Sequence, residues 1–564
     1  MTRFTPAYPA VALVLLPLLL LLGAPPVGDI AAGEGKPVPG GEKVAGSPMP
    51  VDLAGEPATS GLDPATRELR NQVEHLVEPT LRWNGEWGML AVSLATGDTL
   101  LAVDPDRSLV PASNQKILTS AAALHHLGPD YRFSTFLLAR GEIADGVLHG
   151  DLILYGTGDP TFADQPRRGV EAAFPHFLGA LEEMGIREVR GDVLGDESYF
   201  QGPFRRPGWS SASLNDWYGA PVSALTFNEN VATLRVQPTQ AGSPPRASFI
   251  PEAASLPLDN QSLTVASRTP RPFMAIRDDP EVPIVLRGQL TEGSREVWRV
   301  ITVSDPASYA ASVFQGFLEE EGIPVRGSAR AIRHRDKSVI GGGVQAAVRP
   351  GRSQGSQAMV RTVAVHRSPP LAELLRPVNM ESHNLFAELL LFTLGKVVRG
   401  TGSFDEGVRV LEDYVASIAG ASAEGIRLDD GSGLSRHNRL TASSLVRVLQ
   451  HMVEADYGEP FWASLPTAGN HRELGRMYQS PAAGNLQAKT GTIRRVSSLS
   501  GIVRTADGEP VLFSILANQL PSSSAKRIED QIGIGLAAFA RSSGPEGPPA
   551  SVESRVTASS AARQ

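Results

Sequence analysis

The chain has 564 residues, of which 41% are hydrophobic and 20% are charged, and this composition is that of a globular protein long enough for several domains. Its formal net charge of −8 gives no basic footprint for a nucleic acid, so no nucleic-acid partner is expected. The absence of cysteine excludes disulfides, thiolate catalysis and cysteine-ligated zinc.

The N-terminal segment has the pattern of a secretory signal peptide. Arg3 precedes an apolar run from Val11 to Gly23, and two prolines follow that run. A membrane-spanning helix needs about 20 apolar residues, whereas this shorter run is typical of a signal-peptide h-region. We therefore expect residues 1–24 to be cleaved and the protein to be exported to the periplasm or cell envelope with no stable transmembrane anchor. The alternative is an uncleaved N-terminal anchor.

Two further segments are predicted to be disordered. Residues 25–61 and 542–564 are rich in small residues, proline and glutamate, and they show no apolar periodicity. Such segments bury too little apolar surface to fold. We expect a linker before the folded body and a tail after it.

The folded body begins with alternating helix and strand patterns. Residues 62–81 carry apolar side chains at helical spacing behind a possible Asp63-Pro64 start. Two alternating apolar runs then flank residues 96–98, Thr-Gly-Asp, which predicts a β-hairpin. A helix that closes at Gly128 follows this hairpin.

The middle of the chain is predicted to be a β-rich insertion. Short β runs with turn residues extend from about 131 to 332, and predicted helices near 170–184 and 307–320 interrupt them. Helical patterns return at 369–398 and 405–420, before a strand pair within 486–518 and a last helix near 527–540. This order indicates an α+β protein with a guest domain. The expected division is a catalytic domain formed by 62–130 with 356–541, and an insertion of 131–355 that could comprise two subdomains.

Three short motifs occur in order along the chain. A Ser-x-x-Lys motif opens the predicted helix after the hairpin, a Ser-x-Asn motif lies between two helical patterns, and a Lys-Thr-Gly motif lies on a terminal strand. Each motif alone is weak evidence, but their order is specific. The motifs are Ser113-Asn114-Gln115-Lys116, Ser382-His383-Asn384 and Lys489-Thr490-Gly491.

The first motif can form a nucleophile. Residues i and i+3 lie on one face of a helix, so the amine of Lys116 can reach the hydroxyl of Ser113. A serine hydroxyl becomes a good nucleophile when a neighbouring base takes its proton, and a lysine is such a base only when burial or a second cation lowers its pKa. Lys489 could be that cation. A second Ser-x-x-Lys, from Ser523 to Lys526, is interpreted instead as a helix N-cap in a Ser-rich turn.

Together the motifs resemble those of the penicillin-recognising serine enzymes. The long insertion between the first two motifs is similar to that of the D-alanyl-D-alanine carboxypeptidase/endopeptidase family, the class C low-molecular-mass penicillin-binding proteins. Three further stretches resemble this family: residues 156–160 (GTGDP), 218–230 (YGAPVSALTFNEN) and 430–438 (DGSGLSRHN). The resemblance implies a β-lactamase/transpeptidase-like domain, with helices packed on an antiparallel sheet.

The resemblance also implies catalytic roles. Ser113 would be acylated by the penultimate D-Ala carbonyl of a stem peptide, with Lys116 as the general base. Ser382 would relay a proton to the leaving amine, with Lys489 beside it. Asn384 would hydrogen-bond the substrate amide and hold Lys116. His383, between them, is interpreted as a spacer without a role.

Substrate-binding roles follow from the same resemblance. Lys489 and Thr490 would bind the terminal carboxylate or steer the local field. Gly491 completes their motif, and the backbone N–H groups of Thr492 and Ser113 would form the oxyanion hole.

Two more residues are expected near the substrate. Arg436 would contact the peptide, and a structural pairing of Arg436 with Asp429 or Asp430 is the alternative. Tyr218 is expected to line the pocket. Relatives that bind the free end of diaminopimelate carry an aspartate at the position of Ser213, so specificity for that group is in doubt; Asp216 comes three residues later.

The sequence therefore predicts a serine D-Ala-D-Ala carboxypeptidase, with endopeptidase activity on cross-links as an additional expectation. Its partners would be peptidoglycan stem peptides, with β-lactams as covalent inhibitors. No metal or other cofactor is expected, since the 11 histidines form no His-Glu-x-x-His pair. The alternatives are a related serine esterase or D-amino-acid amidase, and a non-catalytic peptidoglycan-binding protein.

Overall fold

The computed structural model describes most of the chain between the two terminal segments. The predicted signal peptide (1–24), linker (25–61) and tail (542–564) lie outside the described residues. Among the described helices, none combines the length and the apolar character that crossing a membrane requires. The described residues are 63–210, 213, 215–253, 255–277, 282–340, 360–420 and 425–541.

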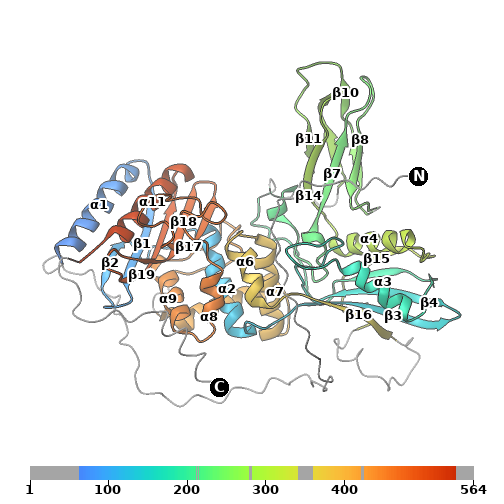
Figure 1. The fold of residues 1–564 in the computed structure, drawn as a ribbon, viewed down its shortest axis with the longest axis horizontal. Helices are drawn as coiled ribbons and strands as arrows, with labels where there is room; N and C mark the ends of the chain where they lie inside the picture. Colours follow the sequence, from blue (N-terminus) through green and yellow to red (C-terminus); the bar gives the residue numbers. More distant parts are fainter. Residues whose placement is uncertain are drawn as a thin grey trace, which may run out of the picture. The chain divides into compact units, whose positions relative to one another are not determined.

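A five-stranded antiparallel sheet joins the two ends of the folded body. Its strand order is β17-β18-β19-β1-β2, so the strand with Lys489 lies at one edge (Figure 1). The predicted hairpin at 96–98 connects β1 and β2. The predicted terminal strand pair is in fact three strands, because a tight turn at Arg495, with φ +60°, separates β17 from β18 without a glycine to signal it. The strands are β1 Glu86–Ser93, β2 Thr99–Val103, β17 Gln487–Ile493, β18 Val496–Arg504 and β19 Pro510–Asn518.

Helices cover both faces of this sheet. Alternate side chains of β1 and β19, including Trp87 and Phe513, point toward α1 and α11 and form one core with them. Helix α9 packs on β1 and β19 from the other side, next to α2 (Figure 1). The helices are α1 Pro64–Leu81, α2 Gln115–Leu127, α6 Leu371–Asn379, α7 Asn384–Arg399, α8 Phe404–Ala419, α9 Ala442–Glu454, α10 Glu459–Ala463 and α11 Ser522–Ala538.

Two helix starts test the sequence interpretation. Helix α1 begins as predicted, since the carboxylate of Asp63 accepts from the Thr66 N–H at 3.2 Å. The N-cap interpretation of Ser523 is wrong. Helix α11 begins at Ser522 after Pro521, so Ser523 and Lys526 lie inside its first turns.

The insertion contains a mixed six-stranded sheet, in which β15, β6, β4, β3 and β16 are neighbours in that order and β5 pairs with β4. Parallel neighbours need crossover connections, and the two predicted helices supply them: α3 lies between β4 and β6 in the chain, and α4 precedes β15. The elements are β3 Ser134–Ala144, β4 Val147–Gly156, α3 Ala173–Glu183, β5 Glu188–Val189, β6 Val193–Asp196, α4 Pro306–Glu320, β15 Ala329–Ile332 and β16 Val360–Arg367.

Eight further strands of the insertion form three small sheets. Their orders are β14-β7-β8, β11-β12-β9 and β10-β13. Phe174 stacks on Phe227 at 5.0 Å between ring centroids, and side chains of β7, β8, β12 and β13 share the core beneath them. The strands are β7 Val231–Gln237, β8 Arg246–Ile250, β9 Leu258–Asn260, β10 Leu263–Val265, β11 Met274–Ile276, β12 Ile284–Arg287, β13 Gln289–Thr291 and β14 Val297–Thr302.

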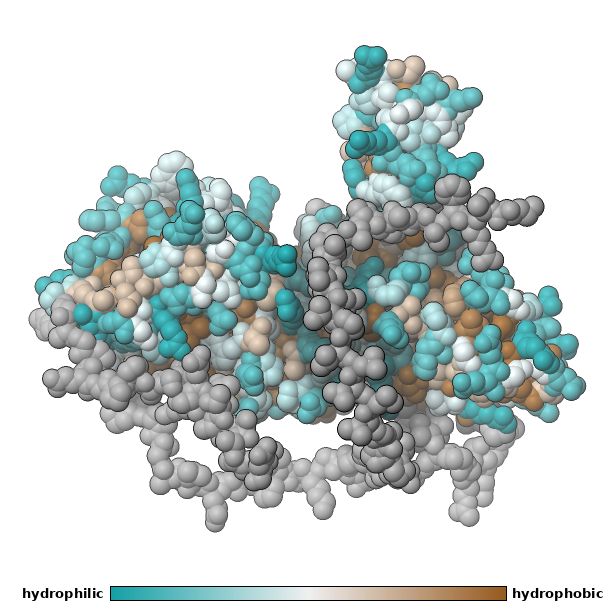
Figure 2. All heavy atoms as spheres, in the orientation of Figure 1, coloured by the Kyte–Doolittle hydropathy of each residue, from teal (hydrophilic) through white to brown (hydrophobic). Residues whose placement is uncertain are grey.

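The six-stranded sheet of the insertion includes a strand beyond residue 355. Strand β16 lies beyond that predicted boundary, yet it pairs antiparallel with β3 in the six-stranded sheet. We therefore propose that the insertion extends to Arg367 and that the second part of the catalytic domain begins with α6. On the face shown in Figure 2, hydrophilic side chains surround smaller apolar areas, as is usual for a folded protein in water.

Candidate active site

The chain presents Ser113 on a strained turn. Ala112, with φ +46°, opens the short 3-10 turn Ala112–Asn114 that runs directly into α2. The side chain of Asn114 is fully buried and donates to Ser500 on β18 at 2.6 Å. This anchor holds the turn against the sheet while Ser113 remains half-buried.

The amine of Lys116 is buried beside the Ser113 hydroxyl. Lys116 is 0% exposed, and its Nζ lies 3.0 Å from Ser113 Oγ, 2.7 Å from Asn384 Oδ1 and 2.7 Å from the Ser432 carbonyl. A neutral amine has two N–H donors and one lone pair. Asn384 and Ser432 can only accept from it at these atoms, so both donors are engaged and the lone pair faces the hydroxyl of Ser113.

The environment of Lys116 favours the neutral amine. Burial lowers the pKa of Lys116 to about 7, although the charges of Glu388 and Asp430 oppose this shift. The lone pair that a general base needs is therefore present in a large fraction of molecules near neutral pH. The expected i, i+3 geometry of the first motif is present.

The second and third motifs meet beside this pair. Ser382 lies between α6 and α7 with φ +59°, and Lys489 Nζ donates to its hydroxyl at 3.0 Å and to the Thr490 carbonyl at 2.7 Å. Burial and the charge of Lys116 lower the pKa of Lys489. The expected influence of one lysine on the other thus acts on Lys489, whereas burial is the main cause of the shift at Lys116.

The glycine of the third motif allows strand β17 to approach the nucleophile. A Cβ at Gly491 would lie 2.9 Å from the Ser113 backbone nitrogen and 2.2 Å from Ser498 Oγ. Only a glycine fits this contact without displacing the turn. Thr490 is half-buried and Thr492 is exposed at the end of the same strand.

The insertion contributes Tyr218 to the site. Asn384 Nδ2 donates to the Tyr218 carbonyl at 2.9 Å, which fixes the amide so that its oxygen faces Lys116. The Tyr218 hydroxyl donates to the exposed Asp216 at 2.6 Å. Ser213 is buried and donates to the Ser210 carbonyl at 2.5 Å, so its hydroxyl is already used within the turn.

Arg436 lies near the end of β17. It is exposed, and its Nη1 donates to the Arg494 carbonyl at 2.8 Å. The alternative of a structural pairing with Asp429 or Asp430 is wrong: Arg206 pairs with Asp429, and four donors from other residues surround Asp430.

His383 is more than a spacer. It is buried, and its Nε2 lies 3.0 Å from Glu229, which comes from the insertion and also accepts from Arg168 at 2.8 Å. Arg168 in turn contacts Glu381, beside the Ser382 motif. These bonds tie the motif loop to the insertion. No local sequence pattern indicates a contact between His383 and Glu229, because the two residues are 154 positions apart in the chain.

A left-handed turn aims Glu229 at His383. Residues 228–230 all have φ between +50° and +56°. Asn230 holds the turn, because its Oδ1 accepts from the Phe227 N–H at 3.0 Å and its Nδ2 donates to the Pro221 carbonyl at 2.9 Å. Asparagine tolerates this conformation better than most residues, which explains the Asn-Glu-Asn sequence.

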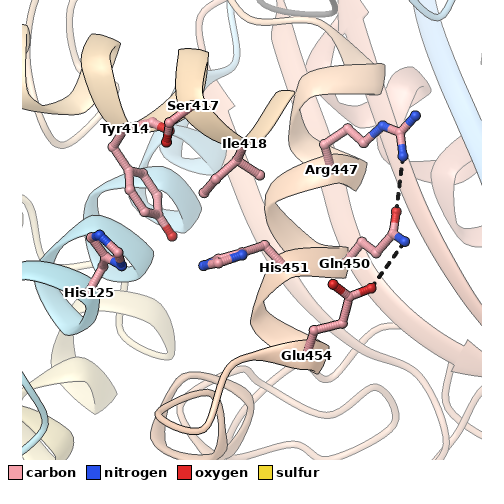
Figure 3. A pocket seen from close by; sticks show the side chains of 8 residues that line it. All are labelled: His125, Tyr414, Ser417, Ile418, Arg447, Gln450, His451 and Glu454. Carbon is pink, nitrogen blue, oxygen red and sulfur yellow. Dashed lines mark hydrogen bonds between the residues drawn. The ribbon is translucent and has the colours of Figure 1, made fainter. Parts of the chain in front are cut away.

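A separate pocket of about 380 Å³ lies near the opposite end of α2. Figure 3 shows side chains of α2, α8 and α9 around it, and His125 and His451 both lie within 2.9 Å of the Tyr457 hydroxyl. No motif residue lines it. Among the described residues, no group of three or more histidine, aspartate or glutamate side chains is arranged to hold a metal ion. The pocket is lined by His125, Tyr414, Ser417, Ile418, Arg447, Gln450, His451 and Glu454.

Comparison with known families gives a decisive match. The profile of the D-Ala-D-Ala carboxypeptidase 3 (S13) family matches residues 69–538. This chain belongs to that family. The match spans both parts of the predicted catalytic domain and the insertion between them, and it confirms the predicted enzyme class at the level of the family.

Individual relatives agree with this assignment. The chain is 31% identical over 527 residues to a D-alanyl-D-alanine carboxypeptidase of Actinomadura sp. (strain R39), which covers 88% of this chain and 90% of the relative. It is 25% identical over 440 residues to D-alanyl-D-alanine carboxypeptidase DacB of Haemophilus influenzae, covering 76% of this chain and 84% of the relative.

A solved structure confirms the fold. The crystal structure of penicillin-binding protein 4 (DacB) from Haemophilus influenzae matches with a TM-score of 0.66 and 24% identity, and the match covers 82% of this chain and 98% of that one. A second structure of the same protein, complexed with a β-lactam, matches with a TM-score of 0.61. The predicted α+β fold, with helices packed on an antiparallel sheet, is therefore correct.

Replacing Gly491 by alanine should slow acylation of the protein by a β-lactam. The added Cβ pushes β17 away from Ser113, and a small misplacement of a nucleophile costs roughly tenfold to a hundredfold in rate. The second-order acylation rate measures this. Gly179→Ala is the control, because its Cβ would meet no atom within 4 Å; equal rates in both variants would contradict the prediction.

Glu229→Gln should weaken the link between the insertion and the Ser382 loop. Glu229 is ionised in its pairing with His383 and Arg168, which lower its pKa. We expect acylation to slow about fivefold to thirtyfold, since breaking a partly buried charged hydrogen bond costs roughly 1–2 kcal/mol. Glu296→Gln, which also loses a pairing with arginine in the insertion, is the matched control and should leave the rate unchanged.

Proposed function

We propose that this protein hydrolyses the terminal D-Ala–D-Ala bond of peptidoglycan stem peptides through an acyl-enzyme on Ser113. The observation that carries the proposal is the buried amine of Lys116. Its donors are taken by Asn384 and Ser432, and its lone pair is directed at the Ser113 hydroxyl. Membership of the family supplies the substrate class.

In the acylation step, Ser113 Oγ attacks the carbonyl carbon of the penultimate D-Ala and its proton passes to Lys116. The backbone N–H groups of Ser113 and Thr492 stabilise the oxyanion. The C–N bond then breaks, and the proton returns to the leaving amine through Ser382, which Lys489 holds at 3.0 Å. Free D-Ala leaves and an ester on Ser113 remains.

In the deacylation step, water attacks the ester carbonyl. The same amine of Lys116 takes a proton from the water, and the proton passes to Ser113 Oγ as the C–O bond breaks. The products are the shortened peptide and the free enzyme. A β-lactam follows the first step alone, because its ring amide opens onto Ser113 without losing the leaving group.

Hydrogen-bond donors lie near the expected position of the substrate's terminal carboxylate. Lys489 and Thr490 lie on β17, and the exposed Arg436 lies beside the end of that strand. We assign the carboxylate to Lys489 and Thr490, with Arg436 as an additional contact and Tyr218 as the wall contributed by the insertion. The guanidinium charge of Arg436 favours a free C-terminus over an esterified one.

The same chemistry requires export of the protein to the cell envelope. Peptidoglycan lies outside the cytoplasmic membrane, and the apolar N-terminal run has the length of a signal-peptide h-region. N-terminal sequencing of the protein recovered from the envelope would test this. A mature N-terminus near residue 25 is expected, and an intact Met1 would contradict cleavage.

Labelling with a fluorescent penicillin tests the nucleophile. We expect stoichiometric covalent labelling of the wild type and none of Ser113→Ala, because among the described residues Ser113 provides the side-chain hydroxyl that hydrogen-bonds to the amine of Lys116. Ser523→Ala removes the serine of the other Ser-x-x-Lys motif and is the matched control, with full labelling expected. Labelling that survives Ser113→Ala would refute the acyl-enzyme.

Release of D-Ala from a stem pentapeptide then separates the peptidase from an esterase or amidase. Wild-type protein should release D-Ala, and a cross-linked dimer peptide offered in parallel measures endopeptidase activity. Labelling by penicillin without release of D-Ala from either peptide would contradict the proposed substrate. It would favour the related esterase.

Acylation should depend on pH in a defined direction. The active form needs the neutral amine, so the rate should rise with pH through about 7 and then level off. Because the charge of Lys116 lowers the pKa of Lys489, we expect this midpoint to reflect both amines. Stopped-flow acylation rates between about pH 5 and about pH 9 measure it. A rate that falls as pH rises through 7 would contradict Lys116 as the base.

A further inference from the structure

A fully buried glutamate lies behind the catalytic lysine without a part in the steps above. Glu388 lies on α7 one turn after Asn384 and is 0% exposed. Its two oxygens accept from consecutive backbone N–H groups, Gly431 at 2.9 Å and Ser432 at 2.8 Å. Burying a carboxylate costs free energy unless its environment compensates the charge, so the position of Glu388 requires an explanation.

The two bonds fix the loop that contacts Lys116. The N–H of Ser432 donates to Glu388, and the carbonyl of the same residue accepts from Lys116 Nζ at 2.7 Å. The Gly431 carbonyl accepts from Thr119 on α2 at 2.7 Å. One residue of the loop thus connects the carboxylate on α7 with the amine on α2.

Four ionisable side chains in this part of the site are each 0% exposed. Lys116 comes from α2, Lys489 from β17, Glu388 from α7 and Asp430 from the loop itself. Asp430 is occupied elsewhere, with Gly433, Ser435, Asn438 and Trp209 as its donors. Glu388 is therefore the carboxylate whose hydrogen bonds lead to the amine of Lys116.

The charge of Glu388 acts on Lys116 as well. Burial and the charge of Asp430 raise the pKa of Glu388 to about 8, and its two N–H partners oppose that shift by favouring the carboxylate. Among the charges that raise the pKa of Lys116, Glu388 is the largest contributor. Without this charge the amine would lose its proton more readily but would also hold the proton from Ser113 less well.

We propose that Glu388 is a positioning residue of this active site. Its carboxylate fixes the Ser432 carbonyl that orients the amine of Lys116, and in its ionised form its negative charge stabilises the ammonium formed when Ser113 gives up its proton. The inference rests on the proposed function, since it assumes that Lys116 takes that proton.

Two substitutions separate geometry from charge. Glu388→Gln keeps the size but loses the charge and leaves one of the two N–H donors facing an amide NH₂. Glu388→Asp keeps the charge but withdraws the carboxylate from the loop by one methylene. Glu529→Gln is the matched control, because Glu529 is also a fully buried glutamate, on α11, and its partner Arg476 retains Asp530.

The readout is the second-order rate of acylation by a fluorescent penicillin across pH, scaled to the fraction of protein labelled at completion. This scaling restricts the rate to folded sites. Glu388→Gln should slow acylation roughly tenfold to a hundredfold on the plateau of the pH–rate profile. It should also move the acid limb, which is the part of the profile where the rate rises with pH, to lower pH. Glu388→Asp should slow acylation with the acid limb unmoved. Glu529→Gln should match the wild type in both respects.

The failures are distinguishable. A wild type that penicillin does not label refutes the proposed function. A labelled wild type with Glu388→Gln unchanged in rate and acid limb refutes the role of Glu388. If Glu388→Gln is slower but its acid limb does not move, the electrostatic role of Glu388 is refuted, and Glu388 is then a structural residue. If Glu388→Gln does not fold, the Glu388→Asp variant provides the test. An unchanged acylation rate in Glu388→Asp overturns the positioning role. A slower rate with an unmoved acid limb supports it.

Discussion

The site depends on keeping one amine both buried and short of a proton. Burial alone would keep the amine neutral but would lower the stability of the fold, because a lysine whose N–H donors lack acceptors in a dry interior is unfavourable. Here the two donors of Lys116 have permanent acceptors, Asn384 and Ser432. The remaining lone pair faces the hydroxyl of Ser113. Because Asn384 and Ser432 occupy both N–H donors, the amine of Lys116 can act on Ser113 only as a base.

That arrangement needs segments from distant parts of the chain. The turn before α2, the start of α7 and the loop at Ser432 contribute to the same amine, and β17 closes the site through Gly491. The central sheet explains how these segments meet, since it pairs the first strands of the folded body with the last. Strand β1 pairs with β19 along its whole length, so the two parts of the catalytic domain form a single core.

Much of this could be predicted from the sequence because the signals are local. The spacing of Ser113 and Lys116, the capping of α1 by Asp63 and the hairpin at 96–98 each depend on neighbouring residues. The turn at Arg495 was not predicted, because an arginine does not indicate a positive φ as a glycine or an asparagine would. Glu388 escaped because a charged residue in an apolar helix normally signals an exposed face, whereas its partners here are backbone groups of a distant loop.

The left-handed turn at 228–230 has a consequence for how this architecture can change. The insertion holds two consecutive residues of the second motif: Glu229 contacts His383, and the Tyr218 carbonyl accepts from Asn384. The insertion is therefore not a detachable accessory. A shorter descendant that lost it would also lose the two supports of its second motif, so the catalytic part and its guest must be inherited, exchanged or engineered as one piece.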